Sequence, residues 1–233
     1  MTIKLYDLAG AEDDRRFSPY CWRIKMALAH KGLEFETIPW RFTEKDAISF
    51  SGQGTVPVLV DGSCTVYDSW NIALYLDEAY PELSLLMDSE QARGAIFVFK
   101  QWCEHNVHPA IFQIIILDLF AHLHDKDKAY FRESREKRLG TTLEAYGSDR
   151  AGALAKLRKA LDTVRPLLVQ QPFIGGSTPS FADYILFGAF QWARVMSPTS
   201  LIESDDPVCS WRERLQDIYG GIARSALGYP VSA

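Results

Sequence analysis

The spacing of hydrophobic and polar residues changes character about a third of the way along the chain. In the first eighty residues, short apolar runs typical of strands alternate with apolar positions at a helical period. The expected strands cover residues 3–6, 33–38, 57–60 and 65–67, and the expected helices begin at Ser18 and at Asp68. Asp61 and Gly62 form a turn between the last two strands, which predicts a hairpin. The order of elements is therefore βαβ, a looser segment, and then ββα.

From about residue 89 onward, strand patterns disappear and helical patterns repeat. The expected helices cover residues 91–124 with a kink at Pro109, then 126–139, 151–170, 180–195 and 206–219. This predicts a domain of residues 1–81, a linker of residues 82–88 and an all-helical domain of residues 89–233. The fold class is α/β followed by all-α. Ser180 and Asp183 have the spacing of a capping box, for which we expect a structural role.

Composition and charge exclude several classes of protein. The chain has 47% hydrophobic and 24% charged residues, and its longest apolar run, residues 114–117, is far shorter than the ~20 residues of a membrane span. A net charge of −5 offers no basic surface for nucleic acid. Residues 1–7 show no apolar leader, and the four cysteines are widely spaced without a CxxC pair. We therefore expect a cytoplasmic protein with reduced thiols and no membrane or nucleic-acid partner.

Two of the expected helices follow a strand and begin with residues suited to an anion. Ser18 is followed by Pro19, and Asp68 is followed by Ser69. Each pair alone is equally a plain helix start, in which the side chain caps the first turn. The amides and dipole of a helix N-terminus also attract negative charge. Two such termini at one edge of a small sheet could together hold a small polyanion.

Residues 55–59, Thr-Val-Pro-Val-Leu, followed by Asp68 and Ser69, resemble the glutathione-binding pattern of the cytosolic glutathione transferases. Residues 18–21 agree with that pattern, and residues 179–183 are similar to the family's capping motif in an internal helix. The resemblance covers the whole chain. It implies a thioredoxin-like N-terminal domain of order βαβ-ββα and an all-helical C-terminal glutathione-transferase domain.

The same resemblance implies a glutathione site. Val56 would offer its backbone to the cysteinyl part of glutathione as an added strand does, with Pro57 in a cis bond. The carboxylate of the γ-glutamyl group would meet the Ser69 hydroxyl and the helix amides, and its ammonium would lie near Asp68. Further candidate contacts come from two loop residues, Gln53 and Arg41, although polar loop residues are often only solvated.

Ser18 would be the catalytic residue by this resemblance. A free thiol titrates near ~8.5, so little of it is thiolate at neutral pH. A hydrogen bond to a charged acceptor contributes about 1.5–3 kcal/mol and a helix terminus about 0.3–1 kcal/mol. Together they lower a thiol pKa by roughly 1.5–3 units. Glutaredoxins and thiol-type transferases carry a nucleophilic cysteine where Ser18 stands, so a mixed disulfide is not available here.

Cys21 leaves a choice between two roles. It occupies the position of the second glutaredoxin cysteine, where a helix N-terminus could lower its pKa for thiol chemistry. It is also a small residue in a first helical turn, which favours simple burial. A thiol-redox function would depend on Cys21 alone.

The acceptor pocket is expected between the two domains, because the long helices and the first-helix loop carry several aromatic residues. Some of these side chains will be ordinary core. The candidates are Tyr20, Trp40, Trp102, His105, Phe112, Trp192 and Met196. His105 and His108 alone do not make a metal site, which needs three or four ligands, so no metal is expected. Residues 132–138 alternate in charge sign, as on a solvated helix face.

The resemblance therefore implies a serine-type glutathione transferase that conjugates glutathione, its co-substrate, to hydrophobic aromatic electrophiles, as in detoxification. Residues 5–8, 18–23 and 67–70 also look like the bacterial branch that contains the β-aryl-etherases of lignin breakdown. Cleavage of a β-aryl ether and a non-catalytic carrier role are the alternatives. The family also implies a homodimer.

Overall fold

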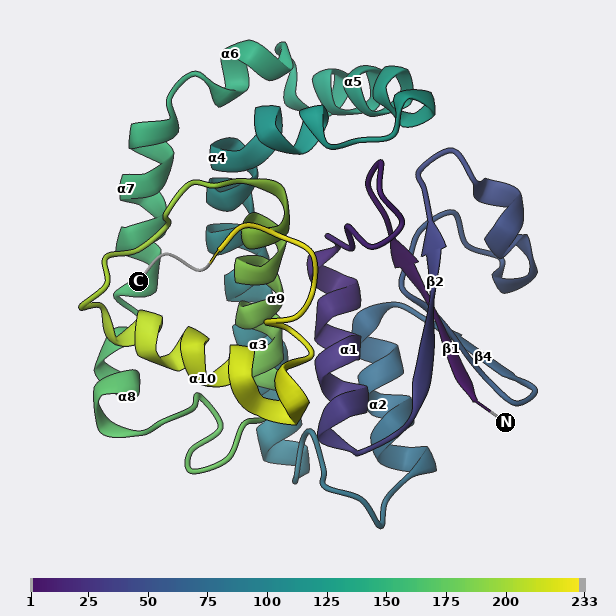
Figure 1. The fold of residues 1–233 in the computed structure, drawn as a ribbon. Coiled ribbons are helices and arrows are strands. Elements are labelled where there is room, and N and C mark those ends of the chain that lie inside the picture. The colour runs from purple at the N-terminus through teal and green to yellow at the C-terminus, as the bar shows by residue number, and fades with distance from the viewer. Residues whose placement is uncertain (1, 231–233) are drawn as a thin grey trace.

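Four strands form one mixed sheet in the N-terminal part of the chain (Figure 1). The computed structural model describes residues 2–230. In the order found across the sheet, the strands are β2 (Phe35–Trp40), β1 (Ile3–Leu8), β3 (Val58–Asp61) and β4 (Cys64–Tyr67). β1 runs parallel to β2 and antiparallel to β3, with Leu5 opposite Leu59. Leu5 and Leu59 are fully buried because their strands lie at the centre of the sheet.

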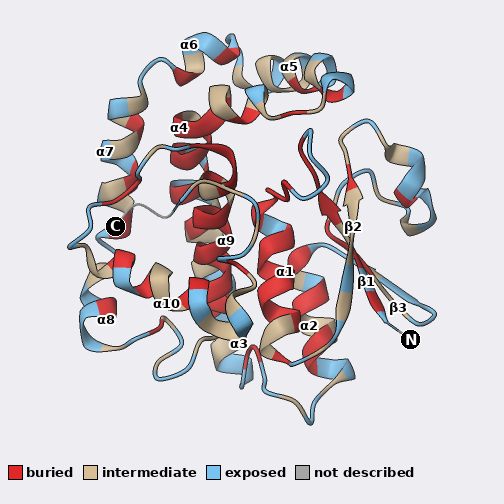
Figure 2. Cartoon of the chain, viewed as in Figure 1, coloured by how far each residue is buried: buried red, intermediate tan, exposed pale blue. Residues whose placement is uncertain are grey.

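Two helices cover one face of this sheet, α1 (Pro19–His30) and α2 (Ser69–Ala79). A short 3-10 helix, η1 (Lys45–Ser51), lies between β2 and β3. α1 is buried along almost its whole length, as Figure 2 shows, because the sheet covers one side and the helical part covers the other. The expected order βαβ-ββα is confirmed.

The rest of the chain is helical, as expected. Its elements are α3 (Glu90–Trp102), the π-helical turn η2 (Cys103–Val107), α4 (His108–Ala121), α5 (Asp125–Leu139), α6 (Leu143–Gly147), α7 (Arg150–Leu161), α8 (Arg165–Gln170), α9 (Phe181–Met196) and α10 (Pro207–Gly221). Among residues 2–230, no helix combines the length and the apolarity needed to cross a bilayer.

Two details of the helical pattern differ from expectation. The break in residues 91–124 falls at η2, just before Pro109, which has no N–H to continue the helical hydrogen bonds. The pattern of residues 151–170 forms two helices, α7 and α8, because Pro166 cannot continue the first helix but fits the start of the second.

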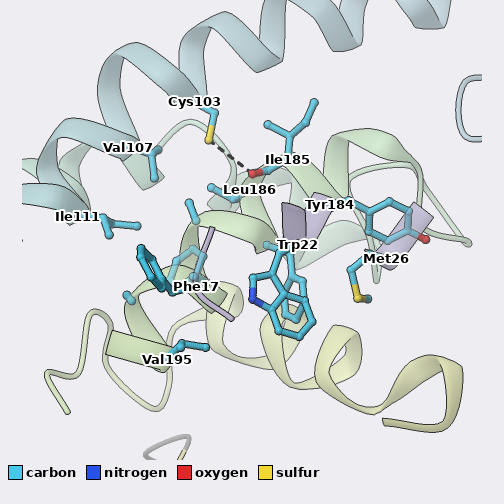
Figure 3. Close-up of a cluster of buried hydrophobic side chains, with 14 of the residues drawn as sticks. Phe17, Trp22, Met26, Cys103, Val107, Ile111, Tyr184, Ile185, Leu186 and Val195 are labelled. Carbon is cyan, nitrogen blue, oxygen red and sulfur yellow. Dashed lines mark hydrogen bonds between the residues drawn. The ribbon is translucent and has the colours of Figure 1, made fainter. Parts of the chain in front are cut away.

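α9 forms the centre of the helical part and packs along α1. Buried side chains of the two helices interdigitate with those of η2 and α4 around Trp22, Val107 and Ile185, as Figure 3 shows. Gly188 allows the closest approach, since a Cβ there would overlap the backbone carbonyl of Pro19. The start of α1 is therefore set directly against α9.

The expected capping box at the start of α9 is present. The Ser180 side chain accepts a hydrogen bond from Ala182 N, and Asp183 accepts one from Ser180 N at 2.9 Å. The Asp183 carboxylate also accepts from Ile174 N at 2.7 Å and from the Trp211 ring nitrogen at 2.8 Å. Asp183 thus ties α9 to the loop before it and to α10.

Candidate active site

A cavity of about 780 Å³ lies between the N-terminal sheet domain and helices α4, α5 and α9. Ten of the residues expected at the site line it. They are Ser18, Tyr20, Trp40, Gln53, Val56, Pro57, Asp68, Ser69, Phe112 and Trp192. The other five expected residues do not line it. They are Cys21, Arg41, Trp102, His105 and Met196.

Ser18 caps α1 at one wall of this cavity. Its backbone is extended, with φ −63° and ψ 122°, and its side-chain oxygen accepts a hydrogen bond from Cys21 N at 3.2 Å. Pro19 occupies the first helical position, where its fixed φ suits the helix. The Ser18 residue is only 3% exposed. Because its oxygen accepts in the cap, the hydroxyl proton is available to an acceptor, either a ligand in the cavity or the neighbouring Cys21 sulfur.

Cys21, one turn into α1, is fully buried and its Sγ lies 3.9 Å from the carbonyl oxygen of Tyr6. Burial, and then the Asp7 carboxylate, raise the pKa of the Cys21 thiol well above its usual value, against the opposing hydrogen bond of Ser18. At neutral pH the thiol is protonated. These observations favour packing over thiol chemistry at Cys21.

Asp68 and Ser69 form the start of α2 at the same cavity. Asp68 Oδ1 accepts from Trp70 N at 2.9 Å and from Asn71 N at 3.2 Å. The φ of Asp68 is 68°, a conformation that is uncommon outside glycine and that concentrates at functional sites. Ser69 is 1% exposed, and its hydroxyl oxygen has no hydrogen-bond partner among residues 2–230. A buried, unpartnered hydroxyl beside a helix N-terminus is suited to an anion.

The segment before β3 presents unpaired backbone to the cavity. The Val56–Pro57 bond is cis, and neither the N–H nor the carbonyl of Val56 bonds to another described residue. Gln53 follows η1, and its side-chain amide also lacks a protein hydrogen bond within the described residues. These groups are therefore available to a ligand that lies along the segment.

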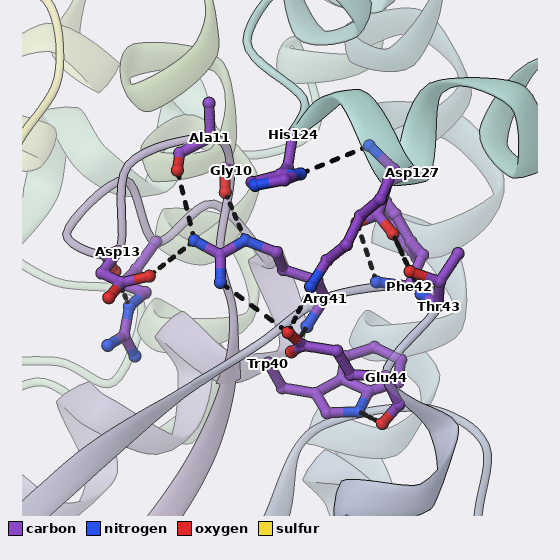
Figure 4. Close-up of polar contacts among 12 residues, drawn as sticks. Gly10, Ala11, Asp13, Trp40, Arg41, Phe42, Thr43, Glu44, His124 and Asp127 are labelled. Carbon is purple, nitrogen blue, oxygen red and sulfur yellow. Dashed lines mark hydrogen bonds and ion pairs between the residues drawn. The ribbon is translucent and has the colours of Figure 1, made fainter.

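Arg41 does not line the cavity, and its guanidinium points toward the loop of residues 10–13 (Figure 4). Its Nε donates to the carbonyl of Gly10 at 3.0 Å, and its Nη2 donates to the carbonyl of Ala11 at 3.2 Å and to Asp13 at 2.5 Å. The guanidinium therefore holds the loop of residues 10–13. On the sheet-domain side, Lys45 lines the cavity, and its Nζ lies 4.9 Å from the centre of the Trp40 ring. Lys45 could have been predicted as a site residue from its position in the sequence, because it lies between two expected contact residues, Arg41 and Gln53.

Asp127 of α5 binds the loop of residues 41–44, which follows β2 (Figure 4). The carboxylate is fully buried, with Oδ2 accepting from Phe42 N at 3.0 Å. Its Oδ1 accepts from Thr43 N at 3.0 Å and from the Thr43 hydroxyl at 2.7 Å. We refer to these contacts as the Asp127 clamp. No sequence pattern indicated the clamp, since its partners lie more than eighty residues away.

A buried ion pair supports the opposite wall. Arg23 on α1 is 0% exposed, and its Nη1 donates to Glu104 Oε1 at 2.7 Å while its Nη2 donates to His108 Nε2 at 3.2 Å. Burial, and then the charges of Arg23 and Lys100, lower the pKa of His108 well below its usual value. His108 is therefore neutral at pH 7, with the proton on Nδ1. Glu104 and His108 both line the cavity.

The π-helical turn explains why Glu104 and His108 occupy this wall instead of Trp102 and His105. A π turn shifts the helical phase that a regular 3.6-residue period assumes. His105 is exposed, with Nδ1 2.7 Å from the carbonyl of Gln101, and Trp102 packs against Phe99 at a centroid distance of 5.0 Å. Met196, at the far end of α9, is fully buried in the core.

Aromatic side chains make up much of the remaining lining. Phe112 and Trp192 are stacked, with ring centroids 5.7 Å apart and an interplanar angle of 19°. Tyr146 lies 5.9 Å from Phe112, and Tyr20 lies 5.4 Å from His108. Within residues 2–230, His, Cys, Asp and Glu side chains do not gather in groups of three or more that could hold a metal ion.

Two family models match the chain. Residues 17–79 match the model described as glutathione S-transferase, N-terminal domain. Residues 96–214 match the model described as glutathione S-transferase, C-terminal domain.

Curated relatives and solved structures agree with these models. Glutathione S-transferase Z2 of Arabidopsis thaliana is 33% identical over 112 residues, which are 46% of this chain and 48% of that protein. The chain spans about a third to a half of the length of the first plant relatives it matches. Among solved structures, glutathione transferase GSTFuA3 from Phanerochaete chrysosporium is 25% identical with a TM-score of 0.83, over 92% of this chain and 96% of that chain. The glutathione S-transferase CsGST63524 of Ceriporiopsis subvermispora, crystallised in complex with glutathione, shares the fold at a TM-score of 0.83 and 23% identity, over 94% and 96%.

Proposed function

Because the chain belongs to the glutathione S-transferase family, we propose that it binds glutathione in the cavity and that Ser18 holds the bound thiol as a thiolate. The observation that carries this proposal is the Ser18 hydroxyl. It is buried, it lies at the N-terminus of α1, and it lines the cavity with a proton to donate. A donor at a helix N-terminus stabilises the charged form of a thiol and thereby lowers its pKa.

The γ-glutamyl carboxylate is proposed to bind at the start of α2. There it would accept a hydrogen bond from the Ser69 hydroxyl, which has no partner among residues 2–230, and it would be attracted by the helix dipole. Asp68 Oδ1 is already used in the cap, so Oδ2 is the atom left for the ammonium group. The Val56 backbone would bond the cysteinyl part, and Gln53 and Lys45 would contact the remainder of the tripeptide. For Arg41 we propose a positioning role, because its donors hold the loop of residues 10–13.

In the proposed reaction the thiol proton is lost to solvent and the thiolate attacks an electrophilic carbon of the acceptor, whose leaving group departs. The aromatic lining suits a planar, hydrophobic acceptor. Ser18 donates to sulfur throughout and does not need to accept a proton. We also propose a homodimer, as the family implies, which light scattering would test.

The test is the pKa of the bound glutathione thiol, measured from thiolate absorbance against pH. We expect a value roughly 1.5–3 units below the ~8.5 of a free thiol, and a return of about 1–2 units toward it in Ser18→Ala. Cys21→Ala is the matched control, because it removes the neighbouring thiol and keeps the Ser18 donor. A depressed pKa that persists in Ser18→Ala would refute the role of Ser18.

Two alternatives, cleavage of a β-aryl ether and a carrier role, are each tested by a separate measurement. Cleavage of a β-aryl ether would have the thiolate displace a phenolate at the carbon next to a ketone, and release of the phenol would detect it. The support for it is the similarity of residues 5–8, 18–23 and 67–70. A carrier would bind an aromatic ligand and return it unchanged in the presence of glutathione.

A further inference from the structure

Two arginines on one face of α5 line the cavity without a carboxylate partner. Arg135 Nη1 donates to the hydroxyl of Ser134 at 2.9 Å, and neither Arg135 nor Arg138 forms an ion pair within residues 2–230. The third arginine of this helix provides the contrast. Arg132 binds Glu136 at 2.9 Å and Glu144 at 2.8 Å. Glu136 and Glu144 are thus paired with Arg132, and they do not neutralise the charge of Arg135 or Arg138.

The carboxylates that line the cavity do not compensate these two arginines. Glu104 is bound by Arg23 at 2.7 Å and by Lys100 at 2.9 Å. Asp68 is used in capping α2. Burial, and then the charge of Arg138, lower the pKa of Arg135. Arg135 is half-buried, whereas Arg138 is exposed at the cavity. A half-buried cation that has no counter-charge is expected to favour an anionic ligand.

The surroundings of both guanidinium groups are aromatic. Arg138 lies 5.4 Å from the centre of the Phe112 ring, which stacks on Trp192. Arg135 lies 5.2 Å from the Phe42 ring and 4.9 Å from the Phe131 ring. Planar walls with guanidinium groups above them suit a ligand that is itself planar and carries an acid group, because guanidinium binds a carboxylate through two parallel hydrogen bonds.

We propose that the acceptor substrate of this site is an aromatic carboxylate, with its ring against Phe112 and Trp192 and its acid group on Arg138 and Arg135. This rests on the proposed transferase function and adds a substrate class to it. Glutathione itself is a different anion. Its γ-glutamyl carboxylate is assigned to Ser69 on the sheet domain, and Lys45 is the cation next to the segment of residues 53–57.

The test uses two electrophiles of the same shape that differ in charge, 4-chloro-3,5-dinitrobenzoate and 4-chloro-3,5-dinitrobenzamide. In each, the thiolate sulfur forms a bond to the ring carbon that carries chlorine. The carbon–chlorine bond then breaks, and chloride leaves with the electron pair. The acid or amide group lies across the ring and is unchanged. Each enzymatic rate is divided by the uncatalysed rate of the same electrophile, which removes the difference in intrinsic reactivity.

The measured quantity is the preference for the benzoate, the ratio of normalised kcat/KM values for benzoate and benzamide. We expect wild type to prefer the benzoate, and Arg138→Gln to lose about 10- to 100-fold of that preference, as for loss of a charge-assisted hydrogen bond. Arg135→Gln should lose part of it as well. Lys137→Gln is the matched control, because it removes one exposed positive charge from the same helix outside the cavity. A wild type without preference, or a preference that survives in the Arg135→Gln/Arg138→Gln double variant, would overturn the proposal.

A binding measurement separates this proposal from the transferase function. Calorimetry would compare 3,5-dinitrobenzoate with 3,5-dinitrobenzamide, neither of which has a leaving group, in the presence of glutathione. Benzoate binding that depends on Arg138, without turnover of either chloro compound, would overturn the transferase function and support the anion site. Turnover of the benzamide together with equal binding of both unreactive compounds would overturn the anion site and support the transferase function. The glutathione Kd in Arg138→Gln decides whether the arginine acts on glutathione instead, which would also overturn the proposal.

Discussion

Ser69→Ala is expected to make the protein more stable and glutathione binding weaker at the same time. The Ser69 hydroxyl is buried without a hydrogen-bond partner among residues 2–230. Burying an unpaired polar group costs about 1–3 kcal/mol, so its removal should raise the free energy of unfolding by up to about that amount. For a chain of this size, each kcal/mol corresponds to about 2–4 °C in Tm.

The same hydroxyl is proposed to bond the γ-glutamyl carboxylate of glutathione. A hydrogen bond to a charged group contributes about 1.5–3 kcal/mol, which is about a 10- to 150-fold change in Kd. Thermal unfolding without ligand measures the first effect, and calorimetric titration with glutathione measures the second. The two effects have opposite signs because the hydroxyl destabilises the free protein, where it is buried without a partner, and stabilises the complex, where it would bond glutathione.

Ser197→Ala provides the matched control for this experiment. Ser197 is also buried, at 3% exposure, but its hydroxyl donates to Asp118 at 2.6 Å and accepts from Thr199 N at 3.2 Å. The same substitution should therefore lower stability by about 1–3 kcal/mol and leave glutathione binding unchanged. If Ser69→Ala also lowers Tm, or if it leaves the glutathione Kd unchanged, the reasoning about the unpartnered hydroxyl is wrong.

Three further predictions concern the supports of the site. Gly188→Ala should lower the free energy of unfolding by about 1–3 kcal/mol and reduce kcat, because the added Cβ overlaps the Pro19 carbonyl at the start of α1; unchanged Tm and kcat would contradict this. His108 has a folded-state pKa below its unfolded value, so the stability it contributes is present above about pH 6.5 and is lost as pH falls. Wild type should therefore lose up to about 1.4 kcal/mol per pH unit below that point relative to His108→Gln, and parallel pH–stability curves would refute it. Asp127→Ala should cost at least about 1.5–3 kcal/mol and speed hydrogen exchange at the amides of Phe42 and Thr43, whereas slow exchange there would show that the clamp is not needed.

Features set by neighbours in the sequence could be predicted from the sequence. The caps at Ser18, Asp68 and Ser180 depend on residues within three positions, and all three are present. The hairpin turn at Asp61 and Gly62 is of the same kind, and Gly62 has the positive φ that the turn requires. Because the elements that carry these caps also form the cavity wall, the expected glutathione-side residues came together with the exception of Arg41.

Features that depend on contacts between distant residues could not be predicted. The alternating charges of residues 132–138 were expected to form a solvated face, and Glu133, Lys137 and Arg138 are exposed. Arg135, which is half-buried, and Arg138 also line the cavity, because the Asp127 clamp fixes which side of α5 faces the sheet domain. The π-helical turn likewise changed which residues of the long helix line the site, and no sequence period signals such a turn.

The Asp127 clamp has a consequence for recombination between related proteins. It joins α5 to the backbone of residues 42 and 43, which lie just before Lys45. The wall proposed to bind glutathione and the wall proposed to bind the acceptor are therefore connected. A chimera that took its sheet domain from one relative and its helices from another would keep this cavity only if both parents hold the loop to α5 in the same way. In this chain, exchange of the helical domain, which carries Asp127, would therefore transfer an acceptor specificity only together with residues 42–45 of the sheet domain.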